Sequence, residues 1–475
     1  MAGTRDGAVA RARAAFDGGA FRDRLAALVA VPSTSQDPAH AGDLAAYLDG
    51  ALRPWLASLG FSVALHPNPR EGFGPVLVGE RVEDAALPTI LLYGHGDTVR
   101  GLDEGWSAGL SPWRLEERGG RWYGRGTADN KGQHALNLAA LEAVLAERGR
   151  GRLGFNLKVL VETAEERGSA GLREFVAANA GALAADVLLA SDGPRVDPSV
   201  PTIATGTRGT WHCDLVVRYR PGGVHSGHWG GVTPDPAVVL SHALASVCDR
   251  RGRVLVPGLL PRGGAIPEAV REALRGCPVG GGGEDSATVD EAWGEPGLTP
   301  AERIYGWSSF VVLAMTSGRP ENPVNAVAPD ARAHCQVRYT VDADPDAFGP
   351  ALRAHLDAAG FPEVAVENGG VRMAASRTDP DHPWVRWARA SLERTLDGRA
   401  RVQVIPNASG GLPGDVFADH LGVPLVWVPH SYNGCKQHGP DEHALPAVLR
   451  EGIAAFAGLW WDLGEPGTPA RGARA

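Results

Sequence analysis

Cysteine is scarce in this sequence, and long apolar runs are absent from it. The five cysteines are an odd number, lie far apart and form no Cys-x-x-Cys pair. This pattern argues against a disulfide framework and against a structural zinc knuckle, and it suits a reducing cytoplasm. No apolar run approaches the ~20 residues of a membrane helix, and the first residues lack the apolar segment of a secretion signal. We therefore expect a cytoplasmic protein with no membrane partner.

Positive charge is also in short supply. The formal net charge is −9, and no basic stripe offsets it. Nucleic-acid binding depends on such a stripe, so we expect no nucleic-acid partner. The shares of hydrophobic residues (44%) and charged residues (21%) are those of an ordinary globular protein, and 475 residues are enough for more than one domain. Some of the surplus acidic side chains could hold cations.

Three short, nearly continuous apolar runs are present at 87–93, 155–162 and 185–191. Such runs are typical of parallel strands that are buried on both faces. The segment 130–148, between the first two runs, has the apolar spacing of a helix. Alternation of strand and helix predicts an α/β fold in which helices flank a mostly parallel sheet.

The pattern changes near residue 207. Segments 211–220 and 331–341 alternate apolar and polar residues, as half-exposed antiparallel strands do. Helix and buried-strand patterns return after residue 378. We therefore predict a first domain that is interrupted by an inserted α+β domain, with the limits 1–206, 207–378 and 379–475. The tail from residue 465 is expected to be disordered.

Polar side chains follow the ends of the apolar runs. They are His95 and Asp97 after the first run, Glu162, Glu165 and Glu166 after the second, Asp192 after the third, Asp129 just before the helical segment, and His438 after the last strand. Ligands of open α/β sheets bind at the carboxyl ends of the strands. We therefore expect these side chains to converge on one crevice.

Such a set of side chains needs cations. Carboxylates gathered without positive charge would repel one another and raise each other's pKa. Two divalent metal ions would relieve this repulsion, and zinc accepts imidazole and carboxylate ligands. A two-metal site also needs one carboxylate that bridges ions ~3.5–4 Å apart. Taken singly, Asp129 reads as a helix cap, Asp192 as a turn residue, and the histidines as surface residues. The joint pattern is what indicates a metal site.

Five segments together resemble a known family, the co-catalytic zinc peptidases. They are GHGDTV (94–99), GRGTADNKG (124–132), ETAEERGSAG (162–171), SDGP (191–194) and HGPDEH (438–443). The family includes carnosinase-type dipeptidases, glutamate carboxypeptidase, aminoacylase and succinyl-diaminopimelate desuccinylase. The resemblance covers nearly the whole chain.

The resemblance implies a role for each polar residue. His95 and Asp192 would bind one metal, Glu166 and His438 the other, and Asp129 would bridge the two. Asp97 would fix the imidazole of His95, and Glu165 would be the general base. His443 is a rival for the position of His438, but His438 matches the family motif. The family often has glycine where this chain has Thr163, which leaves both functional glutamates in place.

The inserted domain carries further resemblances. The segment 224–231 is similar to a family segment whose histidine, here His225, reaches into the active site of a partner subunit, which implies a homodimer. The segment 322–340 is similar to a strand that supplies substrate-binding residues, here Asn325 and Arg338. Taken alone, these are a glycine-rich turn and a solvent-facing arginine. A third similar segment is a glycine-rich loop whose backbone N–H groups can hold a substrate carboxylate, here Ser409, Gly410 and Gly411.

The function implied is a metal-dependent hydrolase that cleaves an amide bond next to a free carboxylate. A dipeptidase or carboxypeptidase is favoured, because the large insertion resembles that of the carnosinase-type branch. The alternative is a deacylase of N-acetyl, N-succinyl or N-carbamoyl amino acids. A non-catalytic binding module is a further alternative, but neither Glu165 nor any metal ligand is missing. Two zinc ions per subunit are expected, with manganese or cobalt as alternatives, and the insertion would serve as lid and dimerisation domain.

Overall fold

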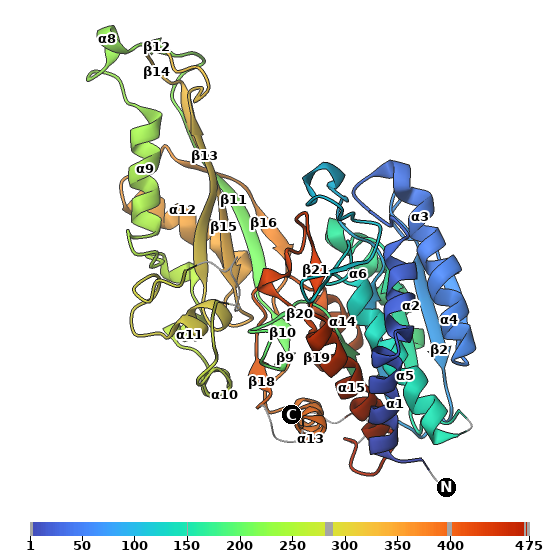
Figure 1. Ribbon diagram of the computed structural model, residues 1–475. Coiled ribbons are helices and arrows are strands. Elements are labelled where there is room, and N and C mark those ends of the chain that lie inside the picture. Colours follow the sequence, from blue (N-terminus) through green and yellow to red (C-terminus); the bar gives the residue numbers. More distant parts are fainter. Residues whose placement is uncertain (1–2, 150, 281–287, 397–400, 470–471, 473–475) are drawn as a thin grey trace.

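The computed structural model describes residues 3–149, 151–280, 288–396, 401–469 and 472. These residues form a larger body, in which helices flank a broad sheet, and a smaller body that projects from it as an elongated arm (Figure 1). The chain passes between the two bodies through the paired strands β10 (Gly206–Thr207) and β17 (Ser376–Arg377). The predicted α/β class is confirmed. The domain limits at residues 207 and 378 stay a prediction.

The main sheet has eight strands in the order β1-β2-β6-β3-β7-β19-β9-β18. Their bounds, in that order, are Ser62–His66, Val76–Arg81, Asn156–Glu162, Thr89–His95, Val187–Ala190, Leu425–Trp427, Thr202–Ala204 and Gln403–Ile405. The central strands β6, β3, β7 and β19 run parallel. The pairs β1–β2, β2–β6 and β19–β9 are antiparallel. The apolar runs at 87–93, 155–162 and 185–191 thus correspond to the parallel strands β3, β6 and β7.

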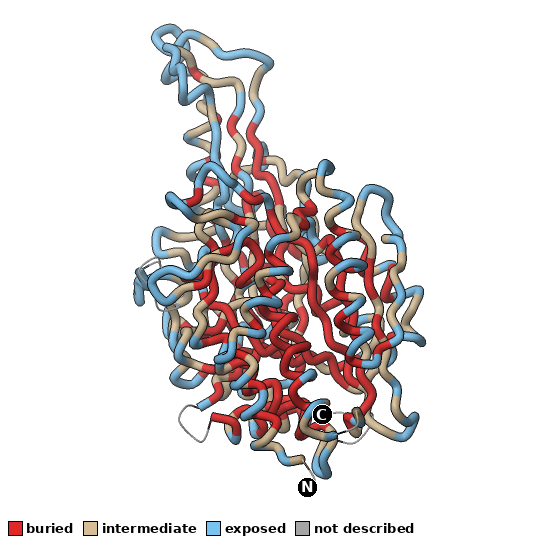
Figure 2. The backbone as a smooth tube through the Cα atoms, turned by 45° about the vertical axis from the view of Figure 1, so that its right-hand side comes forward, coloured by how far each residue is buried: buried red, intermediate tan, exposed pale blue. Residues whose placement is uncertain are grey.

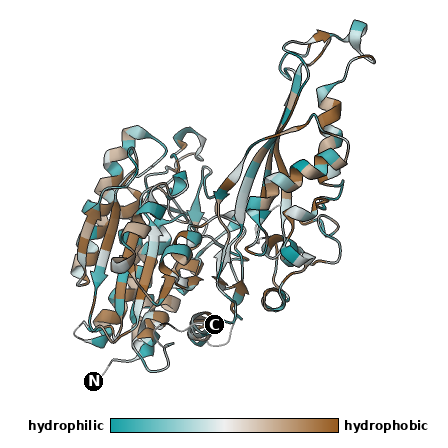
Figure 3. Ribbon diagram, turned by 180° about the vertical axis from the view of Figure 1, so that it is seen from behind, coloured by the Kyte–Doolittle hydropathy of each residue, from teal (hydrophilic) through white to brown (hydrophobic). Residues whose placement is uncertain are grey.

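Both faces of the main sheet are buried, which explains why its strands read as continuous apolar runs. On β3, Ile90 and Leu92 belong to one hydrophobic cluster, and Leu91 and Tyr93 belong to another on the opposite face. This division follows from the two-residue period of a strand. Figure 2 shows the buried core, and Figure 3 shows apolar residues concentrated along these strands.

Helices cover the two faces. The first cluster is formed with α1 (Arg5–Asp17), α2 (Ala20–Val29), α4 (Arg53–Ser58), α5 (Lys131–Arg148), α13 (Pro383–Thr395) and α15 (Pro446–Leu463). The second is formed with α6 (Leu172–Ala178), α7 (Ala180–Leu183) and α14 (Gly414–Leu421). The short helix α3 (Ala41–Ala46) and a π-helical turn at Tyr47–Leu52 lead into α4. The helix predicted over 130–148 corresponds to α5.

The smaller body is built on an antiparallel sheet in the order β13-β15-β11-β16. The strands are Ser309–Ser317, Asp330–Tyr339, Gly209–Arg218 and Ala365–Met373 in that order. Helices α9 (Pro236–Val247) and α12 (Phe348–Ala358) cover one face, where they pack against alternate residues of β11 and β15 such as Leu215 and Val337. We call this four-stranded sheet the small sheet. Its other face carries polar side chains, and we call it the open face.

One part of the insertion packs on the larger body instead. Helices α10 (Glu268–Ala273) and α11 (Pro300–Tyr305) contribute Val270 and Tyr305 to the same hydrophobic cluster as Phe417 of α14. Sequence patterns had assigned this stretch wholly to the inserted domain. Its apolar side chains therefore fasten the insertion to the larger body at a second place.

Short strands complete the fold. A three-stranded sheet contains β4 (Glu116–Arg118), β5 (Arg121–Tyr123) and β21 (His443–Ala444). Strand β8 (Pro194–Arg195) pairs with β20 (Ser431–Tyr432). At the tip of the arm, β12 (Val224–His225) pairs with β14 (Ala326–Val327) beside α8 (Ser226–Trp229). The tail predicted to be disordered is described at residues 465–469 and 472, and its other residues lie outside the described part of the chain. Within the described part of the chain, no helix has the length and apolarity needed to cross a membrane.

Candidate metal centre

The predicted metal ligands meet at one edge of the main sheet. His95 is the last residue of β3, and Asp192 lies two residues beyond the end of β7. Glu166 lies in a 3₁₀ turn (Glu165–Arg167) that follows β6, and Asp129 lies two residues before the start of α5. Because β3, β6 and β7 are parallel, their carboxyl ends bring these side chains together.

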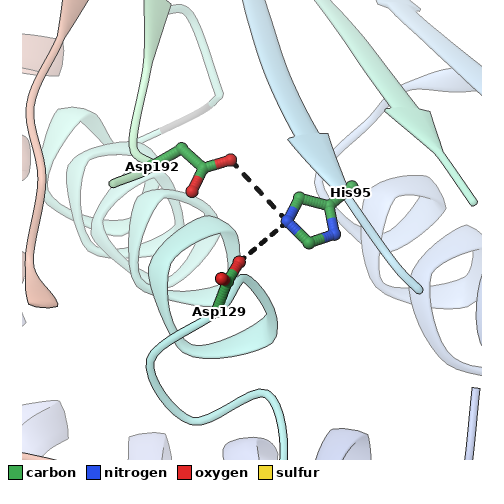
Figure 4. Close-up of side chains that lie close together, drawn as sticks. All are labelled: His95, Asp129 and Asp192. Atoms are coloured by element: carbon green, nitrogen blue, oxygen red, sulfur yellow. Dashed lines mark hydrogen bonds and ion pairs between the residues drawn. The ribbon is translucent and has the colours of Figure 1, made fainter. Parts of the chain in front are cut away.

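His95, Asp129 and Asp192 form a first group. The Nε2 atom of His95 lies 3.0 Å from Oδ1 of Asp129 and 3.7 Å from Oδ2 of Asp192. Figure 4 shows both carboxylates directed at this nitrogen. One ligand atom from each residue lies within 4.8 Å of the others, a spacing at which a single ion could contact all three.

Asp129 also belongs to a second group, with Glu166 and His438. The Nε2 atom of His438 lies 3.3 Å from Oδ2 of Asp129 and 3.2 Å from Oε2 of Glu166. Asp129 therefore offers one carboxylate oxygen to each group. That is the arrangement which a carboxylate bridging two ions requires.

Asp97 contacts both His95 and the turn that carries Glu165 and Glu166, and so fixes their relative positions. Its Oδ1 atom lies 3.4 Å from Nδ1 of His95, whose Nδ1 is also 3.0 Å from the Asp97 carbonyl oxygen. The carboxylate also accepts backbone N–H bonds from Glu165 (3.2 Å) and Glu166 (3.1 Å). A histidine held at Nδ1 presents Nε2 to a metal, and here Nε2 faces the carboxylates.

Three acidic groups of the centre, Glu165, Glu166 and Asp192, are poorly neutralised by the protein. Burial, reinforced by the charge of Asp129, raises the pKa of Glu166 and of Asp192 to about 7. Burial also raises the pKa of Glu165 well above its usual value. Hydrogen bonds to Asp129 and Glu166 raise the pKa of His438 to about 10. A nearby divalent cation would reverse this balance, because it favours the deprotonated form of every ligand.

The donor set fits such cations. The Oδ2 atom of Asp192 is buried and makes no hydrogen bond to any described residue, so it is available as a ligand. Each group combines one imidazole nitrogen with carboxylate oxygens, which zinc accepts. Six predicted residues (His95, Asp97, Asp129, Glu166, Asp192 and His438) thus lie together in positions that would suit two metal ions.

The rival ligand His443 lies elsewhere. Its Nε2 atom is 2.8 Å from the hydroxyl of Tyr432, and its Nδ1 is 3.0 Å from the carbonyl oxygen of Asp441. Within the described chain it belongs to neither group of candidate ligands. The geometry therefore favours His438.

Two of the residues predicted in the insertion, His225 and Asn325, lie apart from the metal centre of their own chain. His225 and Asn325 are exposed at the tip of the arm, where Ser226 donates its N–H to the carbonyl oxygen of Asn325 (2.9 Å). Figure 1 shows this tip, beside α8, far from the larger body. Arg338 lies on β15, on the open face of the small sheet. The loop Ser409–Gly411 follows β18 and lies next to Met373, the last residue of β16 in that sheet.

The family model for Peptidase family M20/M25/M40 matches residues 91–462. This chain belongs to that peptidase family.

Two curated relatives are dipeptidases. The Cysteinylglycine-S-conjugate dipeptidase of Corynebacterium striatum is 36% identical over 287 residues, which are 60% of this chain and 60% of that protein. The Beta-Ala-His dipeptidase of Homo sapiens is 36% identical over 188 residues, which are 39% of this chain and 36% of that protein. The alignments thus span less than two thirds of each relative's length.

A solved structure supports the fold over a longer stretch. The M20 family metallo-carboxypeptidase of Sulfolobus solfataricus superposes with a TM-score of 0.73 and covers 94% of this chain and 99% of its own. Its sequence identity is 22%, so this likeness concerns the fold alone.

Sequence reasoning missed one residue that supports the centre of this M20 chain, Glu442. Its Oε1 atom accepts backbone N–H bonds from Gly126 (3.0 Å), Ala128 (3.0 Å) and Asp129 (3.1 Å). Its Oε2 atom accepts a bond from Nη1 of Arg125 (2.7 Å), and both side chains are buried. Glu442 therefore ties the segment that carries Asp129 to the segment that carries His438. The available signal was its place in HGPDEH, but an acid in a polar loop reads as solvated.

Proposed function

We propose that this chain is a metal-dependent dipeptidase that hydrolyses the amide bond next to a free carboxylate. The observation that carries the proposal is the pair of ligand groups that share Asp129, with Glu165 held beside them. The curated relatives, which are dipeptidases, support the same activity. A cytoplasmic location, expected from the sparse cysteines, is part of the proposal.

The metal ligands are assigned by group. His95, Asp129 and Asp192 would hold one ion, and Asp129, Glu166 and His438 the other, with zinc favoured over manganese and cobalt. When bound, two such ions would polarise the scissile carbonyl and favour deprotonation of a water nucleophile.

Glu165 is assigned as the general base. Hydrogen bonding between its backbone N–H and Asp97 fixes its place beside the ligands (3.2 Å). Burial raises the pKa of its carboxyl group above the usual value, and a carboxyl group placed beside the ligands can act as a general base. Glu165 would take the proton of the attacking water and deliver it to the leaving amine.

Arg338 and the backbone N–H groups of the Ser409–Gly411 loop are assigned to the terminal carboxylate of the substrate. The loop lies next to Met373, the last residue of β16, since a Cβ added at Gly411 would overlap Sδ and Cε of that methionine. A guanidinium and a row of N–H groups suit a carboxylate.

His225 and Asn325 are assigned to the active site of a partner subunit, which makes the protein a homodimer. Both lie on an exposed tip far from their own metal centre, so they could serve a site only across an interface. The tip also exposes large apolar side chains, namely Trp229 (52%), Val232 (77%) and Val324 (70%). Clustered exposed apolar groups are typical of protein contact surfaces. His225 would stabilise the oxyanion that forms at the carbonyl.

A hydrolysis screen tests the proposed function. The purified protein would be stripped of metal, loaded with Zn²⁺, Mn²⁺ or Co²⁺, and offered dipeptides, dipeptide amides, and N-acetyl, N-succinyl and N-carbamoyl amino acids. We expect cleavage of dipeptides in the presence of metal, and little cleavage of the amides that lack a free carboxylate. Cleavage of N-acyl amino acids alone would identify a deacylase. No cleavage with any metal would favour a binding module.

A further inference from the structure

Arg208, which follows β10, is a buried cation with almost no partner. Its side chain is 6% exposed. Within the described chain this side chain makes one hydrogen bond, from Nη1 to Oγ of Ser309 at 3.4 Å, and its Nε makes none. Burial, and next the charge of Arg338, lowers the pKa of Arg208 to about 10. A guanidinium held out of water normally faces a carboxylate, and no described carboxylate pairs with this one.

Arg338 is a second arginine at the same place. Ser309 stands opposite Arg338 in the β13–β15 pairing, so the two side chains share the open face. The Nε of Arg338 donates to Oε1 of Gln336 (3.0 Å), and Nε2 of Gln336 donates to Nε2 of His212 (2.9 Å). These neutral partners orient the guanidinium without cancelling its charge. Two positive charges therefore stand together without an acidic partner among the described residues.

The rest of the open face shows that this imbalance is local. Farther along the same strands, Asp214 accepts bonds from Nη1 of Arg332 (2.6 Å), Nδ1 of His334 (2.6 Å) and Nδ2 of Asn368 (2.7 Å). Arg332 is therefore paired within the protein, although it lies on the same strand as Arg338. On this face, a carboxylate of the protein pairs with Arg332, whereas no described carboxylate pairs with Arg208.

The arginine pair lies beside the loop that is assigned to the carboxylate of the substrate. The backbone N–H of Arg208 donates to the carbonyl oxygen of Ala408 (3.0 Å), the residue before the Ser409–Gly411 loop. Strands β9 and β19 are antiparallel and meet at their last residues, Ala204 and Trp427. Trp427 is the last residue of the parallel strand β19, so Ala204 lies at the carboxyl edge of the parallel strands. That edge also carries the metal centre.

We propose that Arg208 and Arg338 form a two-anion site, which selects dipeptides whose C-terminal residue is acidic. Arg338 and the loop bind the main-chain carboxylate, and Arg208 binds the carboxylate of the aspartate or glutamate side chain. The proposal rests on the function proposed above. Its physical reason is a count of charges: one carboxylate neutralises one guanidinium, and a C-terminal acidic residue brings two carboxylates. Each arginine can bind its carboxylate through two N–H bonds.

Paired substrates test the proposal. The ratio of kcat/KM for Ala-Asp to that for its neutral isostere Ala-Asn would be measured for the metal-loaded wild type, Arg208→Met, Arg208→Lys and Arg332→Met. We expect the wild type to favour Ala-Asp by about 10- to 100-fold, the range of a hydrogen-bonded charge. Arg208→Met should bring the ratio close to one, because cleavage of Ala-Asp should fall much more than cleavage of Ala-Asn. Arg208→Lys should keep part of the preference, and the matched control Arg332→Met should keep all of it.

Folding of the variant is checked separately. Arg208→Met removes a buried charge that lacks a partner, so its melting temperature should equal or exceed that of the wild type. A wild-type ratio near one would overturn the proposal. An equal loss for both substrates in a folded Arg208→Met would also overturn it, because Arg208 would then serve the main-chain carboxylate that both substrates share.

A binding measurement separates this proposal from the proposed function. If no dipeptide is cleaved, the proposed function fails, and calorimetric titration with L-aspartate and L-asparagine still tests the site. Tighter binding of L-aspartate to the wild type, lost in Arg208→Met, would support the two-anion site. Equal binding of the two amino acids, or tighter binding of inorganic phosphate than of L-aspartate, would overturn it.

Discussion

The metal centre of the larger body has an excess of negative charge, whereas the arginine pair of the small sheet has an excess of positive charge. Around Asp129, buried carboxylates outnumber the positive groups near them. Around Arg208, two guanidiniums face no described carboxylate. Buried charge without a partner costs stability, so each imbalance indicates a ligand of the opposite sign. The first region is built to receive cations and the second to receive anions.

The largest effect is expected when the shared carboxylate is removed. Asp129→Ala should lose both metal ions, and with them measurable turnover, because both ligand groups contain Asp129. Asp192→Ala should mainly weaken one site. Metal analysis of the purified variants decides between these outcomes. Retention of two ions per chain in Asp129→Ala would remove the bridging role.

The next largest effect separates catalysis from metal binding. Glu165→Gln should lower kcat by about 10²–10⁴-fold, the usual contribution of a general base, while metal content and melting temperature stay unchanged. Its matched control is the adjacent Glu166→Gln, which should lose metal as well as activity because Glu166 faces His438 and Asp129. A near-normal rate for Glu165→Gln would sink the assignment of the base.

The supporting contacts of the centre should show a large effect on stability. Glu442→Ala leaves the buried guanidinium of Arg125 without its carboxylate, so the free energy of unfolding should fall by about 3–5 kcal/mol. The control is Asp17→Ala, which breaks a solvent-exposed pair with Arg450 and should shift the unfolding midpoint little. Urea titrations followed by tryptophan fluorescence measure both. Similar midpoints for the two variants would show that Glu442 does not brace the centre.

A smaller effect tests whether His225 and the metal centre of one active site belong to different chains. Inactive Glu165→Gln subunits would be mixed with inactive His225→Ala subunits and allowed to exchange. Half of the dimers are then mixed, and each has one site with neither defect, so about a quarter of the wild-type activity should return. Failure to recover activity after confirmed exchange would mean that His225 does not act across the interface.

The two regions also differ in how far the sequence predicts them. The parallel strands and their terminal ligands could be predicted because β3 and β6 are buried on both faces and read as continuous apolar runs. The pairing of Arg125 with Glu442 could not, because the two residues are 317 positions apart and each lies in a polar loop. Arg208 was missed for a related reason. Its burial arises only when β10, the small sheet and the loop after β18 pack together.

The packing of α10 and α11 on the larger body was also missed. Local patterns give the type of an element but not the surface that it covers. Val270 and Tyr305 are ordinary helix residues in sequence, and only the folded chain shows that they meet Phe417.

The contacts of Glu442 also limit how the chain length can vary. His438 reaches Oδ2 of Asp129 at 3.3 Å, and Glu442 accepts the backbone N–H of the same aspartate at 3.1 Å. The chain from 438 to 442 thus closes a small ring on Asp129. One inserted residue adds up to ~3.8 Å of backbone, which is as large as either contact. Unlike an ordinary surface loop, this segment therefore has a fixed length, and an insertion or deletion within it would separate the ligand from its anchor.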